Sequence, residues 1–248
     1  NFESLHQTLN LYNPVQKILF SDAQDCISQL KANQKKDKRT FILAIDSLND
    51  DFLTLSHYLK NEELIVSFFA PANKLDSLTK ENTNVFSAFL LAHQKDSLTQ
   101  SLTGQLIFGG LEAQGDLPDL ISDAFLAGEG LKTKKTRLKY TIPEELKINK
   151  KKLTQVDTLI HQAMDSLAMP GAQILIAKEG KVFYHKAFGF HTYDSLKPVK
   201  LTNLYDLASV TKISSALPAL MKLHGEGKLH LDSAFSKYFE PFKNTNKD

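Results

Sequence analysis

The stretch Leu64-Ile65-Val66-Ser67-Phe68-Phe69 decides the fold of the first half of the chain. All but one of its residues are apolar, and a short apolar run of this kind is typical of a strand buried on both faces of a parallel sheet. Residues 39–45 and 85–91 form two similar runs. Helix-like segments alternate with these runs, at about residues 50–60, 73–80 and 95–108. The pattern predicts an α/β fold, a layered βαβ sandwich.

Open α/β sheets bind ligands beyond the carboxyl ends of their strands. Here those ends lie near Asp46, residues 70–73 and His93. Two interpretations of His93 stay open: it lines a cleft, or it is a hydrogen-bonded structural histidine, the commoner case. No GxGxxG motif follows a strand, and Gly109-Gly110 is expected to form the C-terminal turn of a helix. No nucleotide cofactor is therefore expected.

Three stretches of the first half match one family in their order and spacing: Ile65–Leu75, Gln100–Gly110 and Gly115-Asp116-Leu117-Pro118. Residues 10–125 thereby resemble the C-terminal α/β domain of family 3 glycoside hydrolases. The resemblance implies a β-N-acetylglucosaminidase whose catalytic Asp and His-bearing acid/base loop lie in an upstream (β/α)₈ barrel. Residues 1–128 offer no pair of groups suited to glycoside hydrolysis, so this domain is expected to be catalytically incomplete alone.

Residues 129–145 are expected to be a linker. The segment combines Gly130 and Pro143 with the basic run Lys132–Tyr140, and it has little apolar periodicity. Its lysines form either a patch for an anionic ligand or, as is more common, the solvated surface of a connector.

The second half begins with a helix and a hairpin. Residues 150–167 place apolar side chains at helical spacing, which predicts an amphipathic helix that Met169-Pro170-Gly171 ends. Residues 172–178 and 181–189 are β-prone runs around Glu179-Gly180, and this pattern predicts a β-hairpin.

The motif Ser209-Val210-Thr211-Lys212 comes next, and an apolar helix follows it. A serine hydroxyl is a poor nucleophile until a neighbouring base takes its proton. A residue three positions later on a helix returns to the same face, so Lys212 can reach Ser209 Oγ. Burial near other cations favours the neutral amine that acts as a base. Backbone N–H groups at the helix start favour negative charge that develops on a substrate oxygen.

The S-x-x-K pattern is weak by itself, because Ser28–Lys31 and Ser77–Lys80 also match it. These two matches are interpreted as ordinary surface turns of helices. Only Ser209 follows an amphipathic helix and a hairpin and opens an apolar helix, and a turn at residues 224–232 ends that helix. Context therefore selects Ser209 and Lys212 as the candidate catalytic residues.

Four segments of the second half share a pattern: Met169–Gly171, Ala177–Val182, Leu207–Lys212 and Gly227–Asp232. From about residue 146 onward the chain resembles class C β-lactamases and the related DD-peptidases and esterases. The resemblance implies that Ser209 is the nucleophile and Lys212 the general base. The family's Tyr-x-Asn and Lys/His-Thr-Gly elements do not occur after Lys212 and are expected beyond residue 248. The hairpin is then expected to have an unpaired edge and an exposed apolar face.

Composition excludes several classes of function. The net charge of +2 is too small to indicate a nucleic-acid partner, and no apolar run approaches the roughly 20 residues of a membrane span. Cys26 is the single cysteine, expected to be buried and free, so no intrachain disulfide forms. The histidines of the second half lack metal-ligand spacing, and neither a metal nor a cofactor is expected: His185, His191, His224 and His230.

The order of parts resembles a Bacteroidetes-type fusion, with an α/β domain at 1–128, a linker at 129–145 and a truncated serine hydrolase domain at 146–248. We expect a periplasmic or otherwise extracytoplasmic hydrolase that acts on glycan or peptidoglycan-derived substrates. Its partners would be the upstream barrel and the downstream half of the serine domain. Two alternatives remain: the glycosidase is the main activity, or the chain is a non-catalytic glycan-binding module with a degenerate serine domain.

Overall fold

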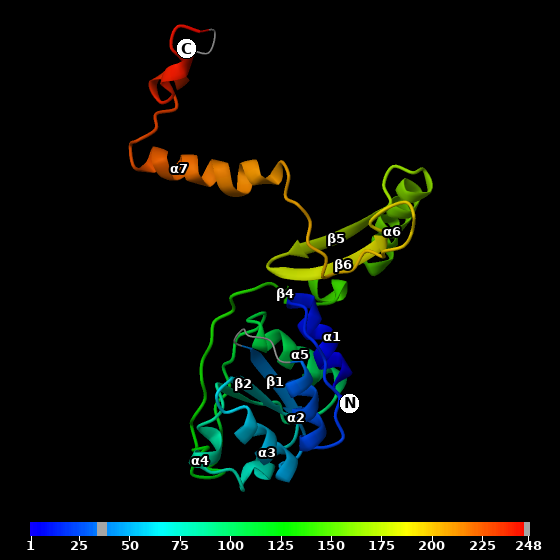
Figure 1. Ribbon diagram of the computed structural model, residues 1–248, viewed down its shortest axis with the longest axis vertical. Coiled ribbons are helices and arrows are strands. Elements are labelled where there is room, and N and C mark those ends of the chain that lie inside the picture. The colour runs from blue at the N-terminus through cyan, green and yellow to red at the C-terminus, as the bar shows by residue number, and fades with distance from the viewer. Residues whose placement is uncertain (34–38, 246–248) are drawn as a thin grey trace. The chain divides into compact units, whose positions relative to one another are not determined.

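The computed structural model describes residues 1–33 and 39–245 (Figure 1). By its internal contacts the chain forms two compact units, Asn1–Thr202 and Asn203–Asp248. The first contains two sheets, and the second contains the S-x-x-K motif and the helix after it.

A parallel sheet forms the centre of the first unit. Its strands are β1 (Thr40–Ile45), β2 (Glu63–Phe68) and β3 (Ala88–Leu91), in the order β1-β2-β3. The predicted three-stranded βαβ arrangement is therefore confirmed. The third strand begins at Ala88, later than predicted, because the backbone N–H of Phe86 closes a turn onto Thr83 O.

Helices cover both faces of this sheet. The helices α2 (Ala23–Ala32) and α3 (Asp50–Tyr58) pack on one face, around Val66 and Phe68. The helices α1 (Glu3–Tyr12) and α5 (Ser97–Ile107) lie on the other, around Phe69. Because both faces are buried, the strands tolerate the continuous apolar runs seen in the sequence.

The helix predictions for this region are partly right. The segments predicted at 50–60 and 95–108 are α3 and α5, capped by the side chains of Asn49 and Asp96. The prediction of one helix at 73–80 is wrong. A 3₁₀ turn, Ala72–Leu75, occupies the start of this segment. A separate one-turn helix, α4 (Lys80–Thr83), begins after Thr79, which forms reciprocal hydrogen bonds with Asn82. Gly109 has φ +74 and closes the end of α5, as predicted.

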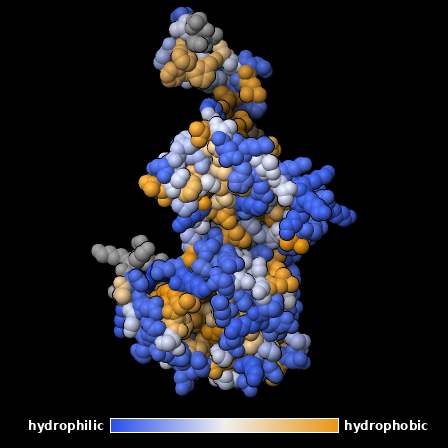
Figure 2. All heavy atoms as spheres, turned by 90° about the vertical axis from the view of Figure 1, so that its right-hand side faces the viewer, coloured by the Kyte–Doolittle hydropathy of each residue, from blue (hydrophilic) through white to orange (hydrophobic). Residues whose placement is uncertain are grey.

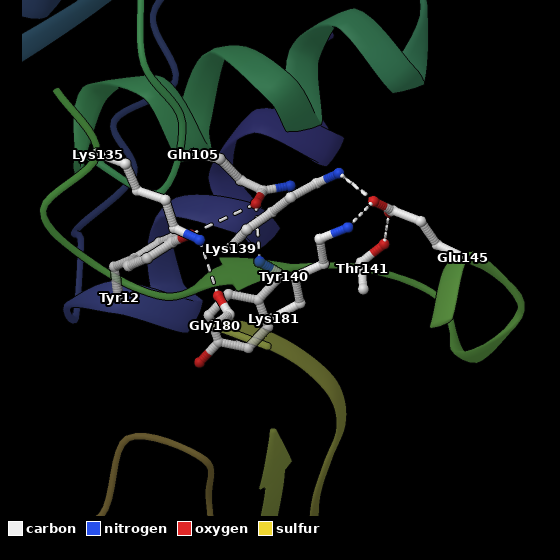
Figure 3. A network of polar contacts seen from close by, with 9 residues as sticks. All are labelled: Tyr12, Gln105, Lys135, Lys139, Tyr140, Thr141, Glu145, Gly180 and Lys181. Carbon is white, nitrogen blue, oxygen red and sulfur yellow. Dashed lines mark hydrogen bonds and ion pairs between the residues drawn. The ribbon is translucent and has the colours of Figure 1, made fainter. Parts of the chain in front are cut away.

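The expected linker contains regular structure. Lys139–Tyr140 form strand β4, which pairs in parallel with β6 (Lys181–Gly189), and Pro143–Leu146 form a 3₁₀ turn. The backbone of β4 forms hydrogen bonds on both sides, and Figure 3 shows the one between Tyr140 and Gln105. Gln105 Oε1 accepts the Tyr140 N–H at 2.8 Å, and Gly180 O accepts the Lys139 N–H at 3.1 Å. The segment is thus fastened to α5 and to the hairpin.

Charged side chains surround β4 as well. The Glu145 carboxylate accepts hydrogen bonds from Lys181 at 2.6 Å, from Thr141 and from Lys139 at 3.0 Å (Figure 3). The bond from Lys181, followed by those from Thr141 and Lys139, lowers the pKa of Glu145 to about 2. Lys135 Nζ donates to Gly180 O at 2.9 Å. Lys135 and Lys139, which belong to the basic run, thus bind neighbouring protein groups.

The predicted helix and hairpin of the second half are confirmed. The helix α6 is Lys150–Asp165, and the strand β5 (Gly171–Lys178) pairs antiparallel with β6. Glu179 and Gly180 have φ values of 53° and 71°. A common two-residue turn of β-hairpins requires a positive φ at both of its residues. In the sheet order β4-β6-β5, β5 has no second partner within the described part of the chain.

The second unit has little buried surface. A π-helical turn (Lys212–Ala216) leads into α7 (Leu217–Gly225), and two 3₁₀ turns follow at Phe235–Lys237 and Glu240–Phe242. The large apolar side chains of α7 are exposed, among them Leu220 and Met221. Figure 2 shows hydrophobic residues among the hydrophilic ones at the surface of the protein. Across residues 1–33 and 39–245, no helix combines the length and apolarity needed to cross a membrane.

Candidate active site

Ser209 lies immediately before the first helical residue, Val210. The backbone reverses at Ala208, whose φ is 43°, in a region that residues with a Cβ adopt uncommonly. The carboxylate of Asp206 accepts the Ala208 N–H at 2.9 Å. The turn therefore places Ser209 at the start of the helix.

The hydroxyl of Ser209 and the amine of Lys212 are in direct contact. Lys212 Nζ donates a hydrogen bond to Ser209 Oγ at 3.0 Å, and the Lys212 N–H donates to Ser209 O at 3.1 Å. Both residues are exposed. A nucleophile within hydrogen-bond reach of a base is the arrangement that nucleophilic catalysis needs.

The helix widens directly at Lys212. The Leu217 N–H donates to Lys212 O, five residues back, within the π-helical turn. π-Helical turns are rare in proteins as a whole, and those that occur are often found at functional sites. Ser214 Oγ donates to Val210 O at 2.9 Å and so takes up a carbonyl of the first turn.

The other two S-x-x-K matches differ in geometry. Ser28 lies on α2, and its hydroxyl donates to the backbone oxygen of Gln24 at 2.8 Å. Ser77 is exposed in the turn before α4. Among these six described residues, a serine–lysine hydrogen bond occurs between Ser209 and Lys212 alone. The catalytic roles of these two residues stay a prediction.

Tyr238 is the tyrosine closest in sequence to a Tyr-x-Asn pattern in this region. Its hydroxyl accepts the His230 N–H at 2.7 Å, and this bond lowers the pKa of Tyr238. The residue thus closes a turn after α7, and it has no Asn two positions later.

The carboxyl ends of the parallel strands border two open hollows. One, of about 500 Å³, is lined by residues 46–48, 73, 74, 76 and 77, and the other, of about 340 Å³, by residues 72, 73, 76 and 118–121. His93 lines neither of these two hollows, and both interpretations of this residue stay predictions. In residues 1–33 and 39–245 no cluster of three His, Cys, Asp or Glu side chains could hold a metal.

Known proteins resemble the second half of the chain. The family described as Beta-lactamase matches residues 156–248. A putative D-alanyl-D-alanine carboxypeptidase of Escherichia coli O157:H7 is 41% identical over 113 residues, which cover 43% of this chain and 26% of that protein. Protein flp of Staphylococcus aureus (strain NCTC 8325 / PS 47) is 42% identical over 89 residues, which cover 36% of this chain and 18% of that protein.

No solved structure matches the chain. The chain spans about a quarter or less of the length of these relatives. Residues 156–248 thus resemble the Beta-lactamase family, and the expected resemblance of this region is confirmed at that level. The match begins inside α6, and no comparison supports a family 3 glycoside hydrolase domain upstream of it.

Proposed function

We propose that this chain supplies the nucleophile and the base of a serine hydrolase of the D-alanyl-D-alanine carboxypeptidase type. Ser209 is the nucleophile, and Lys212 is the general base. The single observation that carries the proposal is the 3.0 Å hydrogen bond between Lys212 Nζ and Ser209 Oγ. The β-lactamase-family match over residues 156–248 supports the choice of reaction class.

The proposed reaction is acyl transfer in two steps. The neutral Lys212 amine takes the proton of the Ser209 hydroxyl as Oγ attacks the carbonyl carbon of the acyl donor. The C–N bond of the donor breaks, and the proton passes to the leaving nitrogen. Water then cleaves the ester, which releases the acid and restores the serine hydroxyl.

Covalent labelling tests this proposal. The full-length protein is incubated with a β-lactam or a fluorophosphonate, and adducts are located by mass spectrometry. We expect one adduct on Ser209 and none in Ser209→Ala. Ser77→Ala, which alters another S-x-x-K serine, is the matched control and should label normally. A folded full-length protein without an adduct at Ser209 would contradict the proposal.

The proposed substrates and location follow from the same resemblance. We expect an acyl donor derived from peptidoglycan, and work in the periplasm or elsewhere outside the cytoplasm. The partners within the protein would be the remaining serine-hydrolase elements and an upstream barrel.

A family 3 glycosidase of the β-N-acetylglucosaminidase type is the second candidate function. The hollow at the carboxyl ends of β1 and β2, beside Asp46 and Asn73, lies where open α/β sheets bind ligands. The α/β part would then complete the sugar cleft of a catalytic barrel.

Nitrophenol release from a β-N-acetylglucosaminide distinguishes the two candidates. Activity of the full-length protein that Ser209→Ala leaves unchanged would favour the glycosidase. A protein that neither labels at Ser209 nor cleaves the glycoside would favour the remaining alternative, a non-catalytic glycan-binding module.

A further inference from the structure

We propose that Asp206 is a positioning residue for the nucleophile. Its carboxylate fixes the backbone turn that presents Ser209 to Lys212. This inference rests on the proposed function, since it concerns the geometry of the same serine.

The contact of Asp206 is local and specific. Its Oδ1 accepts the Ala208 N–H at 2.9 Å. The side chain is exposed, and within the described part of the chain it makes no ion pair. Asp206 therefore contributes to no core and to no salt bridge, and the turn before Ser209 is the structure that it supports.

The turn needs this support because its backbone is unfavourable. Ala208 has φ 43°, where the Cβ of an L-residue crowds the backbone. Such conformations persist when neighbouring contacts hold them, and they cluster at functional sites. A carboxylate bound to the N–H of the same residue is a contact of this kind.

The turn at Ala208 also affects the position of Lys212 relative to Ser209. Directly after Ala208, the N–H groups of Val210, Thr211 and Lys212 each bond to the carbonyl three residues back, at 2.8, 3.1 and 3.1 Å. This tight first turn stacks residue 212 over residue 209 and sets the 3.0 Å contact of their side chains. If Ala208 relaxes, the direction of Ser209 Oγ changes first.

A second turn of the chain provides a matched control. Asp194 accepts the Leu196 N–H at 3.1 Å beside Ser195, whose φ is 58°. In this turn too a carboxylate accepts the N–H two residues later, but the positive φ is at the middle residue and Thr192 Oγ1 also donates to the carboxylate. The turn lies in the first unit, before the S-x-x-K motif in sequence. Removal of the Asp194 carboxylate should disturb a strained turn without any effect on Ser209.

The test compares Asp206→Ala, Asp206→Asn and Asp194→Ala in the full-length protein. The acylation rate constant and the reagent-binding constant are measured separately with a fluorophosphonate. Asp206→Ala should slow acylation about tenfold, the effect of a lost charge-assisted hydrogen bond, and leave binding unchanged. Asp206→Asn retains an acceptor oxygen and should stay within about threefold of wild type, and Asp194→Ala should equal wild type.

The outcomes separate this inference from the proposed function. Wild-type labelling at Ser209 with an unchanged rate in Asp206→Ala overturns the positioning role alone. An equal loss in Asp206→Ala and Asp206→Asn also overturns it, because the acceptor oxygen would then not matter. No Ser209 adduct in folded wild type overturns both, since there would be no nucleophile to position.

Discussion

At the scale of single residues, His185 lies between Tyr140 and Gln173 in a hydrogen-bond network of the first unit. The Tyr140 hydroxyl donates to Leu11 O at 3.0 Å and lies 3.3 Å from His185 Nδ1, while Gln173 Nε2 lies 3.1 Å from His185 Nε2. Because the Gln173 amide also donates to Leu201 O, it faces Nε2 as a donor. The neutral imidazole with a proton on Nδ1 satisfies every one of these contacts.

This network makes stability depend on pH. Burial lowers the pKa of His185 below its unfolded value of about 6.5. Above that pH both states are neutral and the contribution is fully present. As pH falls from about 6.5 through the lower folded pKa, the unfolded state takes up the proton first and stability is lost.

The first prediction follows from that sign. The urea midpoint of the protein should fall between pH 7.5 and pH 5.5, and His185→Gln should reduce this fall. His57→Gln, which changes an exposed histidine of α3, is the control and should preserve it. An identical pH response in His185→Gln and wild type would contradict the interpretation.

Lys212 carries a second prediction at this scale. Arginine retains the charge and the ability to donate to Ser209 Oγ, but its guanidinium does not lose a proton in proteins. Lys212→Arg should therefore slow acylation of Ser209 by about 10² or more, the contribution of a general base. Lys222→Arg, on the same helix, is the matched control. Labelling of Lys212→Arg within tenfold of the wild-type rate would contradict the role of base.

At the scale of elements, β4 connects the α/β layers to the hairpin. Gln105, of which 4% is exposed, accepts the N–H of Tyr140, and the Tyr12 hydroxyl donates to Leu138 O at 2.8 Å. The ring of Tyr12 lies edge-on to Tyr140 at 5.2 Å. Burial raises the pKa of Tyr12 to about 12.

Loss of the Gln105 acceptor should destabilise this junction. Gln105→Leu leaves the N–H of Tyr140 without its partner, which costs about 1–3 kcal/mol. Chemical denaturation measures the loss, and hydrogen exchange should show Tyr140 exchanging faster. Gln114→Leu, at an exposed position, serves as the control. Equal stability of the two variants would show that β4 does not depend on this bond.

At the scale of the whole molecule, the two units differ in burial. The first unit contains both clusters of buried apolar side chains. In the described part of the second unit, Ser236 is the one buried residue, and large apolar side chains of its helix are exposed, among them Ile213 and Met221. Few buried contacts imply a low free energy of local opening.

Limited proteolysis tests this difference on the 248-residue chain. We expect the first cuts within residues 203–233 and protection of residues 40–107, which contain the parallel sheet. Mass spectrometry of the early fragments identifies the sites. First cuts inside β1 or β2 would contradict the assignment of the stable core to the first unit.

The predictable features of this protein are those with local signals. The apolar run of β2, the turn Glu179-Gly180 and the three-residue spacing of Ser209 and Lys212 each depend on neighbours in the sequence. Periodicity and turn chemistry therefore predict them. The helices α1 and α2 were missed, because tertiary packing on the sheet, more than any strong local pattern, stabilises them.

The sequence by itself determined the parallel α/β layers and the hairpin, and it predicted Ser209 as the nucleophile among three S-x-x-K serines. Only the tertiary structure decided that the expected linker contains a strand, that Tyr140 binds Leu11 across 129 positions, and that His185 lies between Tyr140 and Gln173. The physical reason is range: a backbone N–H or a hydroxyl must find an acceptor, but which distant acceptor it finds depends on how the layers pack.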